Sequence, residues 1–145
     1  MKIFMAADHA GVALARHLEG YLKNRRLEIE TFFPDEGRVD YPDYAKKLCT
    51  ALLRSKEGFG ILVCGSGVGM SISANRFKGI RAALCSEPLS AKMTRLHNDA
   101  NVLCLGARMI GTDMSEAILE AFLYTEFEGG RHKIRIDKIE LNEGE

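Results

Sequence analysis

The chain of 145 residues is long enough to bury a full hydrophobic core, and we expect one domain spanning residues 1–145. Its 20 basic and 20 acidic side chains cancel, and 46% of its residues are hydrophobic. This composition excludes a disordered chain and argues against a nucleic-acid partner, and no apolar run approaches the length that crosses a membrane.

Apolar periodicity predicts strands that alternate with helices along the whole chain. The first strand begins at Lys2, so we expect no signal peptide ahead of it and a cytoplasmic protein. The predicted strands cover residues 2–7, 27–33, 60–63, 81–85 and 101–105. The predicted helices cover residues 11–25, 44–52, 70–75, 87–97 and 112–125, and a polar loop spans 34–42. The tail, 131–145, fits a strand or a helix equally well on local pattern.

This alternation predicts an α/β fold, an open and mostly parallel sheet with helices on both faces. Ligands of such sheets bind beyond the carboxyl ends of the strands. Polar candidates follow four of the five predicted strands: Asp8 and His9, Cys64, Ser86 and Glu87, and Arg108. Their convergence on one edge favours a functional site there.

One stretch, residues 58–75 with the sequence GFGILVCGSGVGMSISAN, carries the clearest functional signal. It is typical of a buried strand that ends at Cys64, a glycine turn over 65–69, and the start of a helix. Such a turn exposes backbone N–H groups at the positive end of a helix, where a phosphate or a developing oxyanion binds. The same helix end favours the thiolate form of a nearby cysteine, which indicates chemistry at Cys64. The structural alternative is a tight turn beside a core cysteine.

Two nucleotide-binding motifs do not fit this turn. A dinucleotide fingerprint needs G-x-G-x-x-G and an acidic residue about twenty positions later, whereas here the spacing is G-x-G-x-G and Cys85 and Ser86 follow. No Gly-Lys-Ser or Gly-Lys-Thr of a phosphate-binding loop occurs. The four cysteines, at 49, 64, 85 and 104, form no C-x-x-C pair, which predicts reduced thiols rather than a disulfide framework or a zinc site.

Seven motifs follow one another along the chain: DHAG at 8–11, DYP at 40–42, CGSGVGMSISANRFKGIRAA at 64–83, SEP at 86–88, RLHND at 95–99, GAR at 106–108 and EGGRH at 128–132. In this order they resemble the type B ribose-5-phosphate isomerases, whose family also contains the galactose-6-phosphate isomerase subunits. The resemblance covers essentially the full length.

The resemblance implies a three-layer α/β/α sandwich with a five-stranded, parallel, Rossmann-like sheet. It implies a homodimer, or a tetramer built as a dimer of dimers, with active sites across the subunit interface and a C-terminal helix that packs on the partner. It implies no metal and no organic cofactor. The implied reaction interconverts ribose 5-phosphate and ribulose 5-phosphate through a cis-enediolate, in the non-oxidative pentose phosphate pathway.

The resemblance also implies catalytic roles. Cys64 matches the base that moves a proton between carbons 2 and 1, and Ser66 matches a hydroxyl that relays protons between the two oxygens. Some relatives use a glutamate base in this stretch, where the chain has Asn75, which is expected near the substrate oxygens. His97 matches a ring-opening histidine, with Asp8 near the ring oxygens. The enediolate oxygen is expected to face the backbone of Gly65, Gly67, Val68 and Gly69.

Binding roles follow from the same resemblance. The phosphate is expected to bind His9, Arg108, Arg131 and Arg135. A helical tail puts Arg131 and Arg135 on one face, because they are four residues apart. Asn98 is expected to bind the sugar and Tyr41 to form a pocket wall. His97, Asn98 and Arg108 are expected to act with a Cys64 from the other subunit, or the reverse.

Two alternatives remain at this stage. The same chemistry would serve a six-carbon sugar phosphate, galactose 6-phosphate or allose 6-phosphate. A non-catalytic phosphate-binding module would use the 65–69 loop and be indifferent to Cys64→Ala, but it leaves the ordered motifs unexplained. Cys49, Cys85 and Cys104 are expected to be core thiols.

Overall fold

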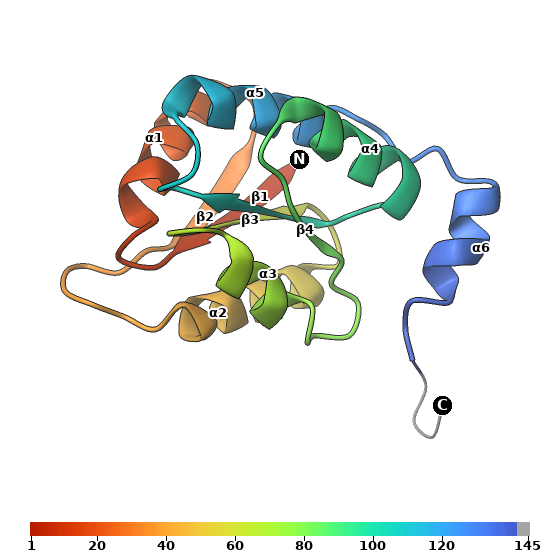
Figure 1. The fold of residues 1–145 in the computed structure, drawn as a ribbon, viewed down its shortest axis with the longest axis horizontal. Helices are drawn as coiled ribbons and strands as arrows, with labels where there is room; N and C mark the ends of the chain where they lie inside the picture. The colour runs from red at the N-terminus through yellow and green to blue at the C-terminus, as the bar shows by residue number, and fades with distance from the viewer. Residues whose placement is uncertain (142–145) are drawn as a thin grey trace.

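The computed structural model describes residues 1–141 and contains one sheet between two helical layers (Figure 1). The strands are β1 (Lys2–Ala7), β2 (Glu28–Phe32), β3 (Phe59–Cys64), β4 (Ala82–Leu84) and β5 (Val102–Gly106). The helices are α1 (Val12–Leu22), α2 (Tyr41–Ser55), α3 (Val68–Ala74), α4 (Pro88–Asn98), α5 (Thr112–Leu123) and α6 (Arg131–Asp137). No helix of the 141 described residues is long and apolar enough to cross a membrane.

All five strands are parallel, in the order β2-β1-β3-β5-β4. The central strands β1, β3 and β5 are almost wholly buried because both of their faces are covered, which explains their continuous apolar runs. The chain leaves β1 toward one edge of the sheet and leaves β3 toward the other, so the strand order switches direction between these two neighbours, which is where a ligand is expected. The prediction of a parallel α/β sheet is confirmed.

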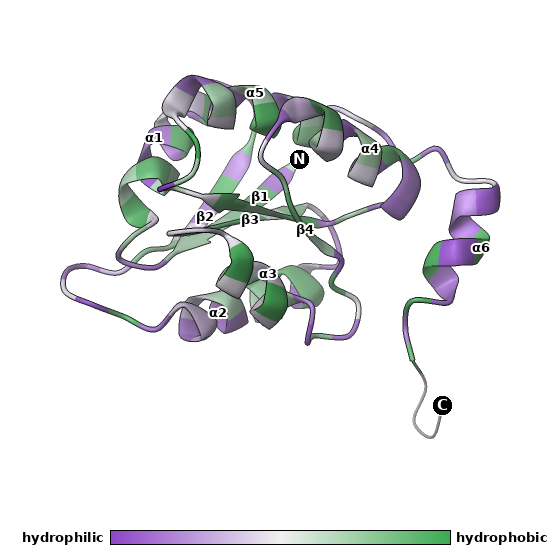
Figure 2. Cartoon of the chain, in the orientation of Figure 1, coloured by the Kyte–Doolittle hydropathy of each residue, from purple (hydrophilic) through white to green (hydrophobic). Residues whose placement is uncertain are grey.

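Two hydrophobic cores lie on opposite faces of the sheet. Helices α1, α4 and α5 cover one face, where Leu18, Leu105 and Phe122 are fully buried. Helices α2 and α3 cover the other, where Leu48 and Met70 are fully buried. Along these helices, hydrophobic and hydrophilic residues alternate in colour, while the central strands are hydrophobic throughout (Figure 2).

The strand β4 forms one edge of the sheet and is only three residues long. The amide of Asn75, just after α3, pairs with both backbone groups of Ala82: its Nδ2 donates to the carbonyl at 2.9 Å and its Oδ1 accepts from the N–H at 2.8 Å. A side chain therefore occupies hydrogen-bonding positions that a further strand would otherwise take.

The largest difference from the predicted boundaries is at α2. Tyr41 and Pro42 begin this helix instead of ending the preceding loop, because Asp40 is extended and proline is tolerated in a first helical turn. In the tail, residues 131–137 form α6, as the resemblance implies, and this helix stands at the side of the molecule next to α4 (Figure 1). Local pattern had left helix and strand open there, and residues 142–145 lie outside the described part.

Candidate active site

A pocket of about 530 Å³ opens at the carboxyl edge of the sheet. Its lining brings together eight residues of the predicted site: Asp8, Tyr41, Cys64, Gly65, Ser66, Val68, Gly69 and Arg108. Ile72 and Met109 complete it with exposed apolar surface. The strand ends and the glycine turn thus meet where the sheet topology predicts a ligand.

Cys64 is the last residue of β3, and its side chain is almost buried in the pocket floor. Its Sγ accepts a hydrogen bond from the backbone N–H of Gly67 at 3.2 Å. Gly67 has φ of 81° and lies so close to Leu84 and Leu105 that a Cβ would come within 2.5 and 2.9 Å of their atoms. Only glycine fits this turn, and the turn is what aims an N–H at the sulfur.

The walls of the pocket pack directly on the glycines of the turn. The ring of Tyr41 covers Gly69, where an added Cβ would lie 2.5 Å from a ring carbon. The guanidinium of Arg108 covers Gly65, with Nη1 3.2 Å from an added Cβ. The Arg108 N–H donates to the carbonyl of Gly65 at 2.9 Å. Glycine at 65 and 69 therefore makes room for the two side chains that a ligand would meet.

Asp8 holds its own turn in place while it lines the pocket. Its Oδ1 accepts hydrogen bonds from the N–H groups of Ala10 at 3.0 Å and Gly11 at 2.9 Å. A Cβ on Gly11 would come within 2.1 Å of the Val63 carbonyl oxygen, so the ends of β1 and β3 approach closely only because position 11 is glycine. This contact fixes Asp8 beside Cys64.

The four cysteines are free and differ in their surroundings. Burial raises the pKa of the Cys49 thiol to about 12 and that of Cys85 to about 11, with Glu87 adding to the latter. Burial also raises the pKa of Cys104 well above its ordinary value. Only Cys64 lines the pocket and accepts a backbone hydrogen bond at its sulfur.

A second group of predicted site residues does not reach this pocket within one chain. His97 and Asn98 end α4, and Arg131 and Arg135 belong to α6. Because α4 runs antiparallel to the strands, its carboxyl end lies at the edge of the sheet opposite Cys64. The prediction that two subunits share the site is not tested by one chain, although sharing requires that His97 and Cys64 lie apart within a chain, as they do. One part of that prediction is wrong: Arg108, grouped there with His97 and Asn98, lines the pocket of its own Cys64, because the loop after β5 packs on Gly65.

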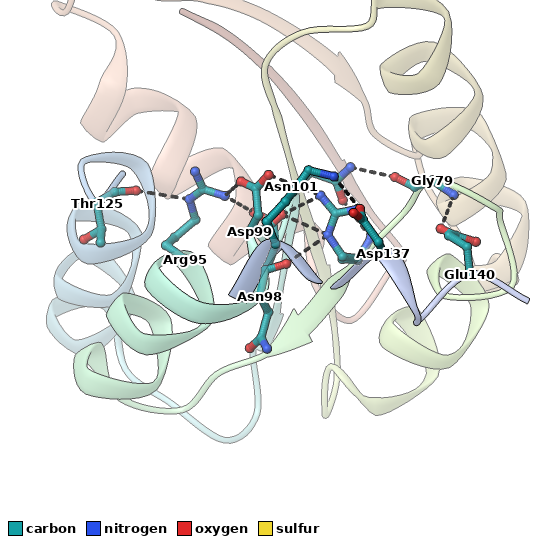
Figure 3. Close-up of polar contacts among 11 residues, drawn as sticks. Gly79, Arg95, Asn98, Asp99, Asn101, Thr125, Asp137 and Glu140 are labelled. Atoms are coloured by element: carbon teal, nitrogen blue, oxygen red, sulfur yellow. Dashed lines mark hydrogen bonds and ion pairs between the residues drawn. The ribbon is translucent and has the colours of Figure 1, made fainter. Parts of the chain in front are cut away.

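A polar network holds the end of α4 (Figure 3). Arg95 is buried and donates to the carbonyl of Thr125 at 3.2 Å and to Asp99 Oδ1 at 2.8 Å. Asp99 ends the helix in the left-handed conformation, with φ of 45°, and also accepts from Arg81. The carboxyl of Glu140 accepts from the N–H of Gly79 at 2.7 Å, which returns the tail to the same edge.

His97 stacks on His132 of α6, with ring centroids 4.4 Å apart and an interplanar angle of 17°. The pKa of His132 is lowered, first by burial and then by positive charge on His97 and Arg131. Glu128 lies beside them, its Oε1 3.8 Å from His132 Nε2. The motif EGGRH contains Glu128 and His132, but we assigned a role only to Arg131 from it, because the contact with His97 depends on how α6 folds back on α4.

Three other sequence-based candidates have local contacts outside the pocket. Asn75 pairs with Ala82, as described above, and does not line the pocket of its own chain, and its expected contact with substrate oxygens stays a prediction. His9 is exposed and its Nδ1 accepts from the N–H of Val39 at 3.2 Å. Glu87 caps α4 by accepting from the hydroxyl and from the N–H of Ser90, and these bonds lower its pKa.

Comparison with known proteins gives concordant matches. Residues 3–139 match the model of a family described as Ribose/Galactose Isomerase. Ribose-5-phosphate isomerase B of Escherichia coli is 43% identical over 95% of this chain and 93% of its own length. The Clostridium thermocellum ribose-5-phosphate isomerase B structure has a TM-score of 0.93 at 44% identity, covering 96% of this chain and 95% of the other.

A solved structure of Mycoplasma genitalium ribose-5-phosphate isomerase B contains bound ribulose 5-phosphate. This chain is similar to it with a TM-score of 0.91 and 39% identity, covering 95% of this chain and 93% of the other. The likeness thus extends over both regions that the motifs mark, the pocket around Cys64 and the end of α4.

Proposed function

Because the chain belongs to the ribose/galactose isomerase family, we propose that it interconverts D-ribose 5-phosphate and D-ribulose 5-phosphate, with Cys64 as the base. The observation that carries the mechanism is the Cys64 sulfur at the floor of the pocket, with the Gly67 N–H directed at it. A backbone donor stabilises a thiolate more than a thiol, because a hydrogen bond to a charged acceptor is stronger.

The chemistry is a proton transfer that needs no external oxidant. The Cys64 thiolate takes the proton from carbon 2 of the open-chain aldose, which leaves an enediolate with its charge on the oxygens. The enediolate is stabilised by backbone N–H groups of the 65–69 turn. Ser66 relays the proton from the oxygen on carbon 2 to the oxygen on carbon 1, and the thiol returns its proton to carbon 1 to give the ketose.

Ring opening is assigned to the second region, acting from a partner subunit, and phosphate binding is shared between that region and the pocket side. His97 exchanges protons with the ring oxygen, and Asn98 binds the sugar. Asp8 lies near the ring oxygens and Tyr41 forms the wall. The phosphate is bound by four basic side chains, His9, Arg108, Arg131 and Arg135, of which arginines offer paired N–H donors suited to phosphate oxygens.

A homodimer, or a tetramer made from two such dimers, is proposed on two grounds. His97 and Cys64 lie at opposite edges of the sheet in one chain. Exposed apolar side chains gather on α3, β4 and α4 beside the pocket: Val68, Ile72, Leu84, Leu89 and Met93. Ile134 of α6 is 63% exposed, which favours the packing of α6 on a partner. A cytoplasmic location is proposed as well, supported by four cysteines that are all free.

The first experiment measures ketose formation in wild type, Cys64→Ala and Cys49→Ala. We expect Cys64→Ala to lower kcat by about 10³-fold, the size of a lost general base, while sugar-phosphate binding persists. Cys49→Ala removes a thiol outside the pocket and is expected to keep activity. Near-normal turnover by Cys64→Ala would sink the assignment of the base. A higher kcat/KM for galactose 6-phosphate or allose 6-phosphate than for ribose 5-phosphate would move the substrate to six carbons.

The ring-opening role has a separate test. Ribulose 5-phosphate is acyclic, because its 5-oxygen carries the phosphate, so proton exchange at its carbon 1 needs Cys64 and no ring step. His97→Asn is therefore expected to lower net isomerisation of ribose 5-phosphate by about 10²-fold and exchange with deuterated water far less. Equal losses in the two measurements would contradict the role of His97.

A further inference from the structure

A cluster of three metal-ligating side chains lies outside the Cys64 pocket, where α6 folds against the end of α4. His97, Glu128 and His132 each direct one ligand atom into it, and these atoms all lie within 4.8 Å of one another. We propose that this cluster binds a divalent transition-metal ion of the Zn²⁺ type, and that the bound ion inhibits the isomerase reversibly. The inhibitory part rests on the proposed function, because it needs His97 as the ring-opening residue.

The backbone around the cluster is held by bonds that do not depend on an ion. The N–H of Glu128 donates to the carbonyl of Leu96 at 3.1 Å, which fixes the segment before α6 to the last turn of α4. Arg95 donates to the carbonyl of Thr125 at 3.2 Å, three residues earlier (Figure 3). These two bonds hold together the two segments that supply the ligands, the end of α4 with His97 and the segment of Glu128 and His132, as a formed site requires.

The buried member of the cluster is His132, and one of its ring nitrogens lacks a hydrogen-bond partner among the described residues. The side chain of His132 is 6% exposed, and its Nε2 has no hydrogen-bond partner among the described residues. That atom faces the Glu128 carboxylate at 3.8 Å, too far for a hydrogen bond. A buried polar atom without a partner costs free energy, and an ion between Nε2 and the carboxylate would remove that cost.

Zn²⁺ fits the cluster after a contraction and after one imidazole turns out of the His97–His132 stack, because two nearly parallel rings cannot both direct an in-plane lone pair at one ion. Ligand atoms on a tetrahedral zinc ion lie about 3.4 Å apart, given Zn–N and Zn–O distances near 2.1 Å. The widest pair must therefore approach by about 1.4 Å, shared between two side chains, and Glu128 is exposed and free to move. Two imidazoles and one carboxylate leave a fourth position for water, the arrangement of an accessible rather than a closed structural site.

The surroundings explain why this ion would be a regulator and not a permanent part of the fold. Arg131 and Arg135 of α6 carry positive charge close to the cluster and oppose a cation, while Glu128 contributes one compensating negative charge. The affinity is therefore lower than in a structural site. When His97 ligates the ion, its ligating nitrogen cannot exchange a proton with the sugar, so ring opening stops.

Binding is tested first, on the full chain in a Cys64→Ala background that removes the pocket thiol as a ligand. Zn²⁺ is titrated against a chromophoric chelator. We expect one ion per subunit, at least a tenfold rise in Kd for both His132→Asn and Glu128→Gln, and no change for His17→Asn. His17 is a matched control, an exposed histidine that also pairs with a glutamate, Glu116, at 2.5 Å.

Glu128→Gln keeps the test valid if His132→Asn does not fold, because Glu128 is exposed and its side chain supports no described hydrogen bond. Zn²⁺ that does not bind, or binds equally well to both variants, overturns the site.

Inhibition is measured separately, with Cys64 intact. We expect Zn²⁺ to lower turnover of ribose 5-phosphate at least tenfold, EDTA to restore it, and Glu128→Gln to blunt the loss. Zinc that binds the cluster without slowing an active wild type overturns the inhibitory part. A wild type with no activity in EDTA overturns the proposed function instead, and leaves the binding result standing.

Discussion

The pocket around Cys64 and the cluster around His97 are built in different ways. The pocket is made by the ends of buried strands, and its shape is set by glycines that admit no Cβ: Gly11 against Val63, Gly67 against Leu105 and Gly69 against Tyr41. The His97 region is made by the end of α4, the start of α6 and the segment just before α6. It is held by a few hydrogen bonds through Arg95, Asp99 and Glu128.

Because of this difference, the atoms of the pocket are held more firmly in place than the atoms of the His97 region. Atoms at the ends of close-packed strands can move only if the core moves, so the thiol and its N–H donor are preorganised. Atoms at a helix end depend on polar contacts worth about 1 kcal/mol each, so they are easier to displace. If the two regions meet across a subunit interface, the rigid one supplies the base and the adjustable one closes over the sugar.

The largest expected effect tests whether the regions belong to one site. Cys64→Ala and His97→Asn subunits, each inactive as a homodimer, are co-expressed with different tags and the mixed dimer is purified. If each site takes Cys64 from one subunit and His97 from the other, a mixed dimer has one intact site and half of wild-type activity, a gain on the order of 10²-fold over either parent. If both residues come from one subunit, every site in the mixture carries a defect and no activity returns.

The next effect tests the rigidity of the pocket. Gly69→Ala pushes a Cβ against the ring of Tyr41, which must move into the pocket, so we expect KM for the sugar phosphate to rise about tenfold. Gly20→Ala is the matched control in α1, where an added Cβ meets nothing within 4 Å. It is expected to leave KM unchanged and to stabilise the protein by about 0.5–1 kcal/mol. Unchanged KM in Gly69→Ala would show that the wall is not tightly packed.

A smaller effect concerns the contacts of the His97 region. Asp99→Asn keeps the shape and the tolerance for positive φ but removes the charge that faces buried Arg95, so unfolding free energy should fall by about 1 kcal/mol, allowing for the partial exposure of Asp99. Urea unfolding measures it. Asp137→Asn breaks the exposed pair with Lys133 on α6 and should change stability by only a few tenths of that, about 0.3 kcal/mol. Equal losses would mean that Arg95 is not held by Asp99.

The smallest effect is a pH dependence from His132. Its pKa in the folded chain lies below the ordinary 6.5, so the unfolded chain takes up the proton first as pH falls. The stability present above pH 6.5 is therefore lost progressively as pH drops through the folded pKa. The melting temperature should fall as the pH is lowered from 7.5 to 5.5, and it should fall less steeply in His132→Asn than in wild type. Parallel curves would contradict this assignment.

The sequence predicts the pocket well and the second region poorly, for a physical reason. Strand ends lie on one edge by topology alone, so Asp8, Cys64 and Arg108 could be brought together from the order of the elements. The strand boundaries shift by only one or two residues for the same reason, since apolar runs set them. The stacking of His132 on His97 depends on a turn at 124–130 that no periodicity encodes, and the resemblance indicated only that α6 is a helix.

Asn75 shows a different limit of sequence reasoning. The resemblance implies a contact between Asn75 and the substrate, which stays a prediction. The fold gives Asn75 a further role that the resemblance does not indicate, because the neighbouring edge strand has backbone groups that must be paired and Asn75 pairs those of Ala82. Glu87 is similar, since a carboxylate just ahead of a helix is as well suited to capping the helix as to chemistry. Which backbone groups need a side-chain partner becomes known only when the spatial neighbours of each residue are known.

The pairing of Asn75 with Ala82 also bears on how subunits assemble and exchange. With the N–H and carbonyl of Ala82 occupied, a strand from another copy cannot pair with β4 at this residue, so any association through that face would rely on side chains such as Leu84 and Leu89. Subunits joined in this way can separate and re-pair as whole folded units, without unzipping a shared sheet. The pairing of Asn75 with Ala82 also opposes edge-to-edge polymerisation of the sheet. Asn75→Ala is expected to increase aggregation when the protein is concentrated or stored.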